Sequence, residues 1–250
     1  MIERYADTFA TDHMWCLPVV GETYDGVLND INARGVTEAH ALEALNSAAP
    51  GAVAEGNVGG GSGMIAYEFK GGTGTASRRI DVAGRTYHLG VMVQANHGTR
   101  DWLEISGVPV GREMRDDLVY PSDLGSIIVV IATDAPLLPH QLDRVARRGS
   151  IGIGRNGTKG GNNSGDIFLA FSTANPQKNP WHAPDVMTLE ALKDTHLDGF
   201  YAATVQATEE AVINAMVAAT DRIAVKPKGH KVRAIDHVRL MDIVRGYRRT

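Results

Sequence analysis

The chain has 250 residues, a net charge of −4, and 43% hydrophobic and 22% charged residues, a composition typical of a soluble globular protein with a sizeable core. Its one cysteine, Cys16, excludes an intramolecular disulfide and a zinc site built on cysteines. No apolar stretch is long enough to span a bilayer, and the first residues lack a signal-peptide pattern, so we expect a cytoplasmic protein with no membrane partner.

Neither the charge pattern nor the histidines indicate a nucleic acid or a metal. Residues 226–250 contain eight Lys or Arg and two Asp, a local surplus of +6. A basic tail can bind nucleic acid, but the helical pattern at 234–244 favours a solvated basic helix face instead. The nine histidines show no HExxH or other metal spacing. We therefore expect no nucleic acid, no metal and no other cofactor.

The first half of the chain predicts a helix, a glycine-rich turn and two strands. The helix covers 36–48. The glycine run at 55–63 lacks the Gly-Lys-Ser/Thr of a phosphate-binding loop, so a tight turn with close backbone approach is the better interpretation. Strands are expected at 64–69 and 86–96, followed by loops at 98–125.

The second half of the chain alternates apolar strands with helices. Uninterrupted apolar runs predict strands at 126–133 and 167–173, the first of them buried on both faces. Helices are expected at 139–148, 208–220 and 234–244. Because strands and helices alternate without strict βαβ regularity, we expect a mixed sheet covered by helices, in one domain that spans the whole chain.

A serine, Ser126, stands at the first position of an apolar strand, which is an unusual place for a hydroxyl. Its position makes sense if the bond after Gly125 is cut, because Ser126 then gains a free α-amine beside its hydroxyl, as in an N-terminal nucleophile. An α-amine has a pKa of about 7.7–8.0 and can act as a base at neutral pH. Since Gly125 has no side chain, Ser126 Oγ can attack its carbonyl with little obstruction. From the residues alone, a serine that only starts the strand is the alternative.

A second polar cluster, Ser164-Gly-Asp166, stands at the start of the other apolar strand. If the two strands are neighbours, these side chains meet Ser126. A carboxylate there would favour the ammonium form of the new terminus and would orient the amine or the hydroxyl through hydrogen bonds. The alternative is a Ser/Asp turn that caps the strand.

Several longer motifs occur in a fixed order along the chain. They are Leu-Pro-Val-Val-Gly-Glu-Thr-Tyr-Asp-Gly at 17–26, Leu-Asn-Asp-Ile at 28–31, Glu-Gly-Asn-Val-Gly-Gly-Gly-Ser-Gly-Met at 55–64, Gly-Thr-Ala-Ser-Arg at 74–78, Val-Gln-Ala-Asn-His-Gly at 93–98, Gly-Ser-Ile-Ile-Val-Val-Ile-Ala-Thr-Asp-Ala-Pro-Leu at 125–137 and Ser-Gly-Asp-Ile-Phe-Leu-Ala-Phe-Ser-Thr at 164–173. Together they resemble the self-processing L-aminopeptidase/D-esterase family, which includes the β-peptidyl aminopeptidases. Only sixteen residues precede the first motif, so we expect the chain to lack the long N-terminal segment of that family.

The resemblance implies a cleavage position after Gly125 and a role for each of six other residues. Family members are inactive precursors that cleave themselves, which here falls after Gly125 and gives an α chain, 1–125, and a β chain, 126–250. The serine that opens the β chain is the nucleophile. The roles fall on the nucleophile Ser126, the supporting pair Ser164 and Asp166, the oxyanion-hole residue Asn96, and two residues near the substrate amine, Glu22 and Tyr24.

The resemblance also implies a fold and an activity. The fold is an αββα sandwich with two central sheets, similar in architecture to the N-terminal nucleophile hydrolases but different in connectivity, and the proteins assemble as homo-oligomers. The activity is that of a serine aminopeptidase, which releases N-terminal amino acids from small peptides, amides or esters through an acyl-enzyme. Two alternatives stay open: an inactive truncated remnant, and an acyltransferase of the related ornithine acetyltransferase type. The latter has a threonine nucleophile, so Ser126 favours hydrolysis.

Overall fold

The computed structural model describes residues 6–11, 18–118, 125–176 and 184–247, so that Cys16 and Leu17 lie outside the described residues. The strands are β1 (Ile65–Ala66), β2 (Phe69–Lys70), β3 (Gly72–Val82), β4 (Arg85–Asn96), β5 (Ser126–Thr133), β6 (Ile167–Ser172), β7 (Arg222–Ile223) and β8 (Lys231–Val232). The helices are α1 (Ala6–Thr11), α2 (Glu38–Asn46), α3 (Val110–Glu113), α4 (Pro139–Arg155), α5 (Leu197–Val217) and α6 (His237–Tyr247).

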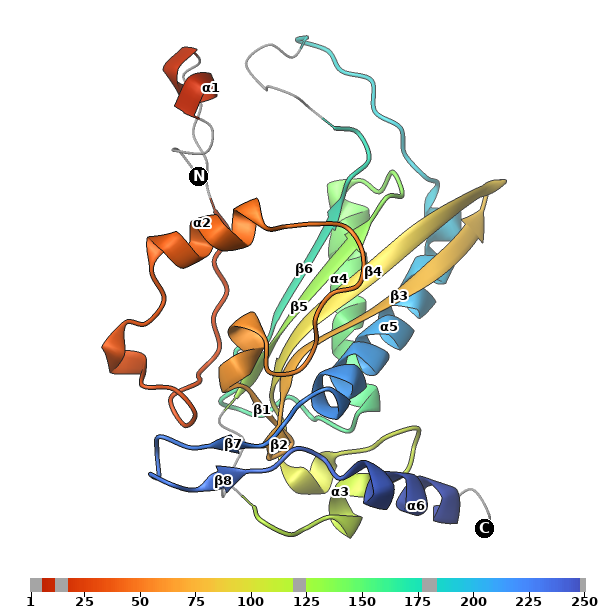
Figure 1. Cartoon of the computed structure of the whole chain (residues 1–250). Helices are drawn as coiled ribbons and strands as arrows, with labels where there is room; N and C mark the ends of the chain where they lie inside the picture. Colours follow the sequence, from red (N-terminus) through yellow and green to blue (C-terminus); the bar gives the residue numbers. More distant parts are fainter. Residues whose placement is uncertain (1–5, 12–17, 119–124, 177–183, 248–250) are drawn as a thin grey trace.

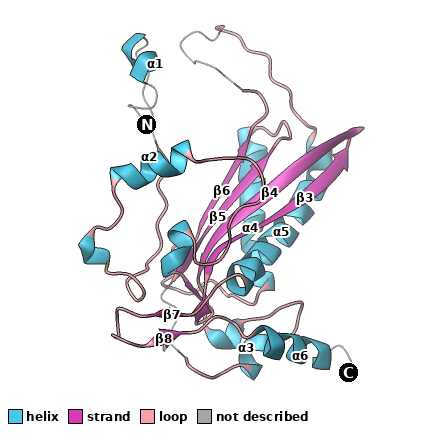
Figure 2. Ribbon diagram, in the orientation of Figure 1, coloured by secondary structure: helices cyan, strands magenta, loops and turns pink. Residues whose placement is uncertain are grey.

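A four-stranded mixed sheet, in the order β3-β4-β5-β6, lies at the centre of the described structure (Figure 1). Successive strands from β3 to β5 are antiparallel, whereas β5 and β6 are parallel. Helix α5 packs on β3 and β4, α4 packs on β6, and the two helices pack on each other, so they cover one face of the sheet (Figure 2). The predicted mixed sheet with a helical cover is confirmed, and these residues form one helical layer and one sheet of the expected sandwich.

The other face of this sheet is only partly covered by described residues. Along β5 buried residues alternate with half-buried ones, and along β6 half-buried residues alternate with exposed ones. Met92 and Phe171 on this face are 44% and 42% exposed, and the segment 51–53 lines a shallow groove with them. The prediction that the strand at 126–133 is buried on both faces is therefore wrong for the described structure. The apolar run shows that both faces are apolar, not that both are covered.

The segment expected to form one strand at 64–69 is instead a tight hairpin. β1 and β2 pair with Ile65 opposite Lys70. At the tip, Tyr67 and Glu68 have positive φ angles of 50° and 62°. Positive φ at both central residues is typical of the type I′ turn, which usually has Asn or Gly there. Because this turn uses neither residue, local sequence gave no signal for it.

Glycines account for two further differences from the predicted elements. Strand β3 was not predicted, since the two glycines at its beginning, Gly72 and Gly74, weaken its strand character. Helix α4 continues to Arg155 instead of ending before Gly149. A Cβ on Gly149 would lie 2.6 Å from the Phe168 ring, and one on Gly152 would lie 2.6 Å from Thr208 Cβ. These glycines therefore allow close packing of α4 on β6 and α5 rather than ending the helix.

The other predicted elements are present with shifted ends. Strands β4 and β6 and helix α2 lie close to their predicted bounds, α5 begins eleven residues before the predicted helix at 208–220, and α6 begins and ends three residues later than expected. The stretch at 98–118 is mostly loop but includes α3. No helix in the described part of the chain has the length and apolar character needed to cross a membrane.

Candidate functional site

The starts of two neighbouring strands bring the predicted nucleophile and its predicted helpers together. Ser126 is the first residue of β5 and lies opposite Asn96, the last residue of β4. On the other side of Ser126, the loop before β6 supplies the backbone N–H of Gly165, which donates to Ser126 Oγ at 2.9 Å. The side chain of Ser126 is half-buried, so its hydroxyl is held in place but is not sealed from solvent.

Asp166 links the beginning of β5 to Ser164. Its Oδ1 atom accepts a hydrogen bond from the Ile127 backbone N–H at 3.0 Å and a short hydrogen bond from the Ser164 hydroxyl. The carboxylate is therefore fixed one residue away from the nitrogen that would become a new N-terminus if the bond after Gly125 were cut.

The Asn96 side chain is buried, and both ends of its amide are engaged in hydrogen bonds. Oδ1 accepts from the Ile65 backbone N–H at 2.7 Å. Nδ2 donates to Thr23 Oγ1 at 2.9 Å and to the Tyr24 carbonyl at 2.7 Å. Because an amide NH₂ has two hydrogens, any group that develops negative charge beside Asn96 has to take one of them over.

Thr23 is a site residue that the sequence did not reveal. Its buried hydroxyl accepts from Asn96 Nδ2 and donates to the Ser126 carbonyl at 3.1 Å. It thus connects the predicted oxyanion residue to the predicted nucleophile. Its position between Glu22 and Tyr24 was an available signal. The prediction assigned roles to these charged and aromatic neighbours and not to the small hydroxyl between them.

Glu22 and Tyr24 lie near the start of β5, because Thr23 between them donates a hydrogen bond to the Ser126 carbonyl. Both side chains are exposed, Tyr24 to 47%. Among the described residues, neither the carboxylate of Glu22 nor the hydroxyl of Tyr24 has a hydrogen-bond partner. Their polar groups are therefore open to a ligand from solvent.

The site has no space for a side chain at Gly125. A Cβ at this position would lie 1.6 Å from the Asn96 carbonyl oxygen and 3.2 Å from Asn96 Nδ2. Any other residue would push β4 away from the start of β5. The same closeness places the backbone of Gly125 against the Asn96 amide.

A buried histidine, His97, follows Asn96 directly. Its ring packs edge-on against Tyr67 with 5.0 Å between ring centroids, and neither ring nitrogen has a hydrogen-bond partner within the described residues. Burial lowers the pKa of His97 to about 4, and the negative charge of Asp166 opposes this only in part. The imidazole is therefore neutral at neutral pH and a poor proton acceptor.

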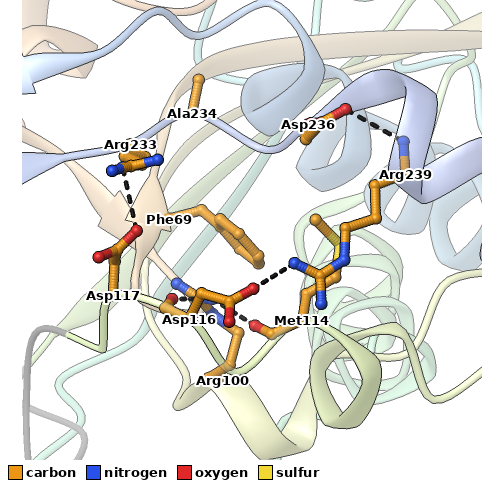
Figure 3. A pocket seen from close by; sticks show the side chains of 9 residues that line it. All are labelled: Phe69, Arg100, Met114, Asp116, Asp117, Arg233, Ala234, Asp236 and Arg239. Atoms are coloured by element: carbon orange, nitrogen blue, oxygen red, sulfur yellow. Dashed lines mark hydrogen bonds and ion pairs between the residues drawn. The ribbon is translucent and has the colours of Figure 1, made fainter.

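Neither a metal cluster nor a charged cavity competes with this site in the described structure. No three His, Cys, Asp or Glu side chains among the described residues gather where they could hold a metal ion. A cavity of about 110 Å³ is lined by charged residues, none of them a predicted site residue (Figure 3). Its charges are compensated, since Arg233 pairs with Asp117, Arg239 pairs with Asp116, and the buried Arg100 donates to four backbone carbonyls. These contacts favour a structural connection between the segments before and after Gly125.

Thr23→Val is expected to lower the free energy of unfolding by about 1–3 kcal/mol, the usual cost of leaving buried polar groups unsatisfied. The Asn96 amide would lose an acceptor and the Ser126 carbonyl would lose a donor, while valine keeps the shape of threonine. Urea denaturation in a Ser126→Ala background, where no self-cleavage is expected, measures this change. Thr188→Val, at an exposed position without a hydrogen bond to the described residues, is the matched control. Equal stability of the two variants would mean that the Thr23 bridge contributes nothing.

Comparison with known proteins gives consistent matches over most of the chain. The model of peptidase family S58 matches residues 1–231. β-Peptidyl aminopeptidase BapA from Sphingosinicella microcystinivorans is 48% identical over 251 residues, with 94% of this chain and 62% of that protein covered. The BapA protein of Sphingosinicella xenopeptidilytica is 44% identical, with 92% and 60% covered. The chain therefore spans about three fifths of the length of these curated relatives.

Solved structures match the fold just as closely. The L-aminopeptidase D-Ala-esterase/amidase from Ochrobactrum anthropi, a variant of the Ntn hydrolase fold, superposes with a TM-score of 0.94 at 56% identity and covers 100% of this chain and 68% of its own. A β-aminopeptidase from a Burkholderia species gives a TM-score of 0.88 at 43% identity, with 98% and 69% covered. These matches confirm both the resemblance read from the motifs and the expected α+β architecture of N-terminal nucleophile hydrolases.

Proposed function

Because this chain belongs to peptidase family S58, we propose that it acts as a self-processing serine aminopeptidase. The observation that carries the proposal is the position of Ser126, which starts β5 between Asn96 and the Gly165–Asp166 loop. The substrates are small peptides, amides or esters with a free amino end. This agrees with the relatives, which are a β-peptidyl aminopeptidase and an L-aminopeptidase D-Ala-esterase/amidase.

In the first step the chain cuts itself after Gly125. Ser126 Oγ attacks the Gly125 carbonyl carbon, the C–N bond of that peptide breaks, and the nitrogen takes the hydroxyl proton. Water then hydrolyses the resulting ester. The products are a carboxylate on Gly125 and, on Ser126, a restored hydroxyl beside a free α-amine.

In each turnover the same hydroxyl attacks the carbonyl of the substrate's N-terminal residue. The Ser126 α-amine accepts the proton, with Asp166 and Ser164 holding the polar groups around it. Asn96 Nδ2 exchanges one of its present partners for the developing oxyanion. The substrate C–N or C–O bond breaks, the leaving group takes the proton, and water releases the amino acid from the ester on Ser126.

Recognition of the substrate's amino end falls to Glu22 and Tyr24. The Glu22 carboxylate can pair with an ammonium group, and the Tyr24 hydroxyl lies two residues away on the same exposed segment. A single anchoring charge of this kind would restrict hydrolysis to the first residue of a peptide. We also expect assembly into a homo-oligomer.

The intact mass of the purified protein tests the proposal. We expect two chains, residues 1–125 and 126–250, whose masses add up to 26.8 kDa plus one water. Both chains should elute together on gel filtration, and the sample should release amino acid from an aminoacyl p-nitroanilide. A single uncut chain in fresh and aged samples, folded by circular dichroism, would favour an inactive remnant. Acyl transfer to an added amine that outcompetes water would favour an acyltransferase.

A further inference from the structure

A lysine, Lys70, is completely buried in β2, with 0% of its surface exposed. Its ammonium donates to three backbone carbonyls: those of Gly61 at 2.8 Å, Met64 at 2.9 Å and Gly71 at 2.8 Å. No carboxylate of a described residue forms an ion pair with it. Burying an ammonium without a counter-ion costs free energy. A lysine that is nevertheless buried, with all three N–H groups bonded to carbonyls, is therefore expected to have a specific role.

The carbonyls around Lys70 give a structural explanation for part of the glycine run at 55–63. A Cβ on Gly61 would lie 2.3 Å from the Thr73 backbone nitrogen, so only glycine lets the loop approach β3 and turn its carbonyl to Lys70. The run therefore supplies one of the three carbonyls that accept from the Lys70 ammonium. We refer to Lys70 and the three carbonyls that accept from it as the Lys70 cluster.

The Lys70 cluster contacts the candidate site through the Met64–Ile65 peptide group. The carbonyl of Met64, which accepts from Lys70 Nζ, and the N–H of Ile65 belong to the same peptide unit. That N–H donates to Asn96 Oδ1 at 2.7 Å. A continuous series of hydrogen bonds thus runs from the Lys70 ammonium through the Met64–Ile65 peptide to the Asn96 amide.

We propose that Lys70 is a positioning residue that strengthens Asn96 as the oxyanion donor. A charge-assisted bond to the Met64 carbonyl polarises the peptide, which makes the Ile65 N–H a better donor to Asn96 Oδ1. The Asn96 amide is polarised in turn, and its Nδ2 hydrogens become stronger donors where the reacting carbonyl gains negative charge. This inference rests on the proposed function, because it requires the oxyanion to form beside Asn96.

The relay gives the reaction a specific pH dependence. Burial, and to a lesser extent the positive charge of Arg222, lowers the pKa of Lys70 from its ordinary 10.5 to about 7. The neutral amine has only two N–H groups and faces a third carbonyl with a lone pair, so the relay weakens as the pH rises through about 7. Stability moves the other way: the unfolded chain holds the proton up to about pH 10.5, so the free energy of unfolding rises between these pH values. A loss of rate in this range would therefore not come from destabilisation by the titration of Lys70.

Lys70→Met tests the relay through a double-mutant cycle with Asn96→Ala. In the processed enzyme we expect Lys70→Met to lower kcat about tenfold, a part of the 10²–10³ that one oxyanion donor contributes, with KM unchanged. In the Asn96→Ala background the same substitution should have no further effect. The exposed Lys228→Met is the matched control and should leave kcat as it is. Equal losses in both backgrounds would overturn the relay alone, whereas an unchanged rate in Asn96→Ala would overturn the oxyanion role as well.

The pH profile gives a second test that needs no Lys70 variant. The ratio of kcat in the unchanged enzyme to kcat in Asn96→Ala cancels the titration of the Ser126 amine, which both share. We expect this ratio to fall about tenfold between pH 6 and pH 9. A ratio that stays constant over this range would overturn the relay even if Lys70→Met failed to fold.

Discussion

Ser126→Ala is expected to leave the chain uncut at 26.8 kDa and to lower hydrolysis by about 10⁴–10⁶-fold, the range found when a serine nucleophile is removed. The substitution removes the Oγ atom that, in the proposed mechanism, attacks both the Gly125 carbonyl and the substrate. The fold should tolerate it, because alanine fits the half-buried start of β5 and the Gly165 N–H is exposed enough to bond to water. Intact mass and release of p-nitroaniline measure the two losses, and circular dichroism checks the fold.

Two companion variants make this result specific. Ser126→Thr keeps a hydroxyl at the same place and should still cut itself, whereas Ser126→Ala should stay uncut. Ser150→Ala removes an exposed serine hydroxyl from α4 and should behave like the unchanged protein. Cleavage or hydrolysis that survives in Ser126→Ala would move the nucleophile to another residue.

The contacts around Ser126 that arise from strand order could be predicted from the sequence. Two apolar runs with polar residues at their beginnings, Ser126 and Asp166, predict that the polar groups meet if the strands are neighbours. The structure brings them together, with the Asp166 carboxylate bonded to the Ile127 N–H and the Gly165 N–H bonded to Ser126 Oγ. Periodicity gives the position of the first residue of each strand, and the polar groups meet because β5 and β6 are parallel neighbours in the sheet.

The contacts that depend on convergence of distant segments could not be predicted in this way. Thr23 lies 103 residues from the carbonyl to which it donates, and no local pattern marks it as buried. Lys70 looks like an ordinary surface lysine, because lysine is almost never fully buried. Its burial depends in part on the Gly61 carbonyl of the glycine run, whose direction is set only when the loop meets β3. The turn at Tyr67–Glu68 was missed for the same reason: its positive φ angles are imposed by the surrounding structure.

The two kinds of contact have different consequences for the site. The strand-derived contacts place the groups to which we assign the proposed reaction: the hydroxyl of Ser126, the carboxylate of Asp166 and the amide of Asn96. The convergent contacts of Thr23 and Lys70 fix the Asn96 amide from both ends, one through Nδ2 and the other through the peptide bonded to Oδ1. In the proposed mechanism, the electrostatics at Asn96 therefore depend on residues that motif matching does not single out.

Asn96→Ala is expected to reduce kcat by about 10²–10³ with KM nearly unchanged, and to slow self-cleavage by a similar factor. The alanine removes the amide that we propose as the oxyanion donor, while the proposed recognition of the substrate through Glu22 is left intact. It also leaves the Ile65 N–H without its acceptor, so we expect a loss of about 1–3 kcal/mol in the free energy of unfolding. The kinetics are therefore measured well below the unfolding temperature, with the exposed Asn32→Ala as the matched control.

Asn96→Asp separates an electrostatic role from a structural one. The aspartate has the shape of asparagine and can still accept from the Ile65 N–H, but it has no amide hydrogens and brings a negative charge to the oxyanion. If Asn96 stabilises developing negative charge, kcat should fall further in Asn96→Asp than in Asn96→Ala. The carboxylate also lies against the Tyr24 carbonyl, so the free energy of unfolding of both variants is measured as well. If Asn96 only supports the packing of β1 against β4, the variant with the higher free energy of unfolding should be the more active of the two. A kcat for Asn96→Asp above that of Asn96→Ala would therefore remove Asn96 from the oxyanion hole, and Lys70 would lose its proposed route to the reaction.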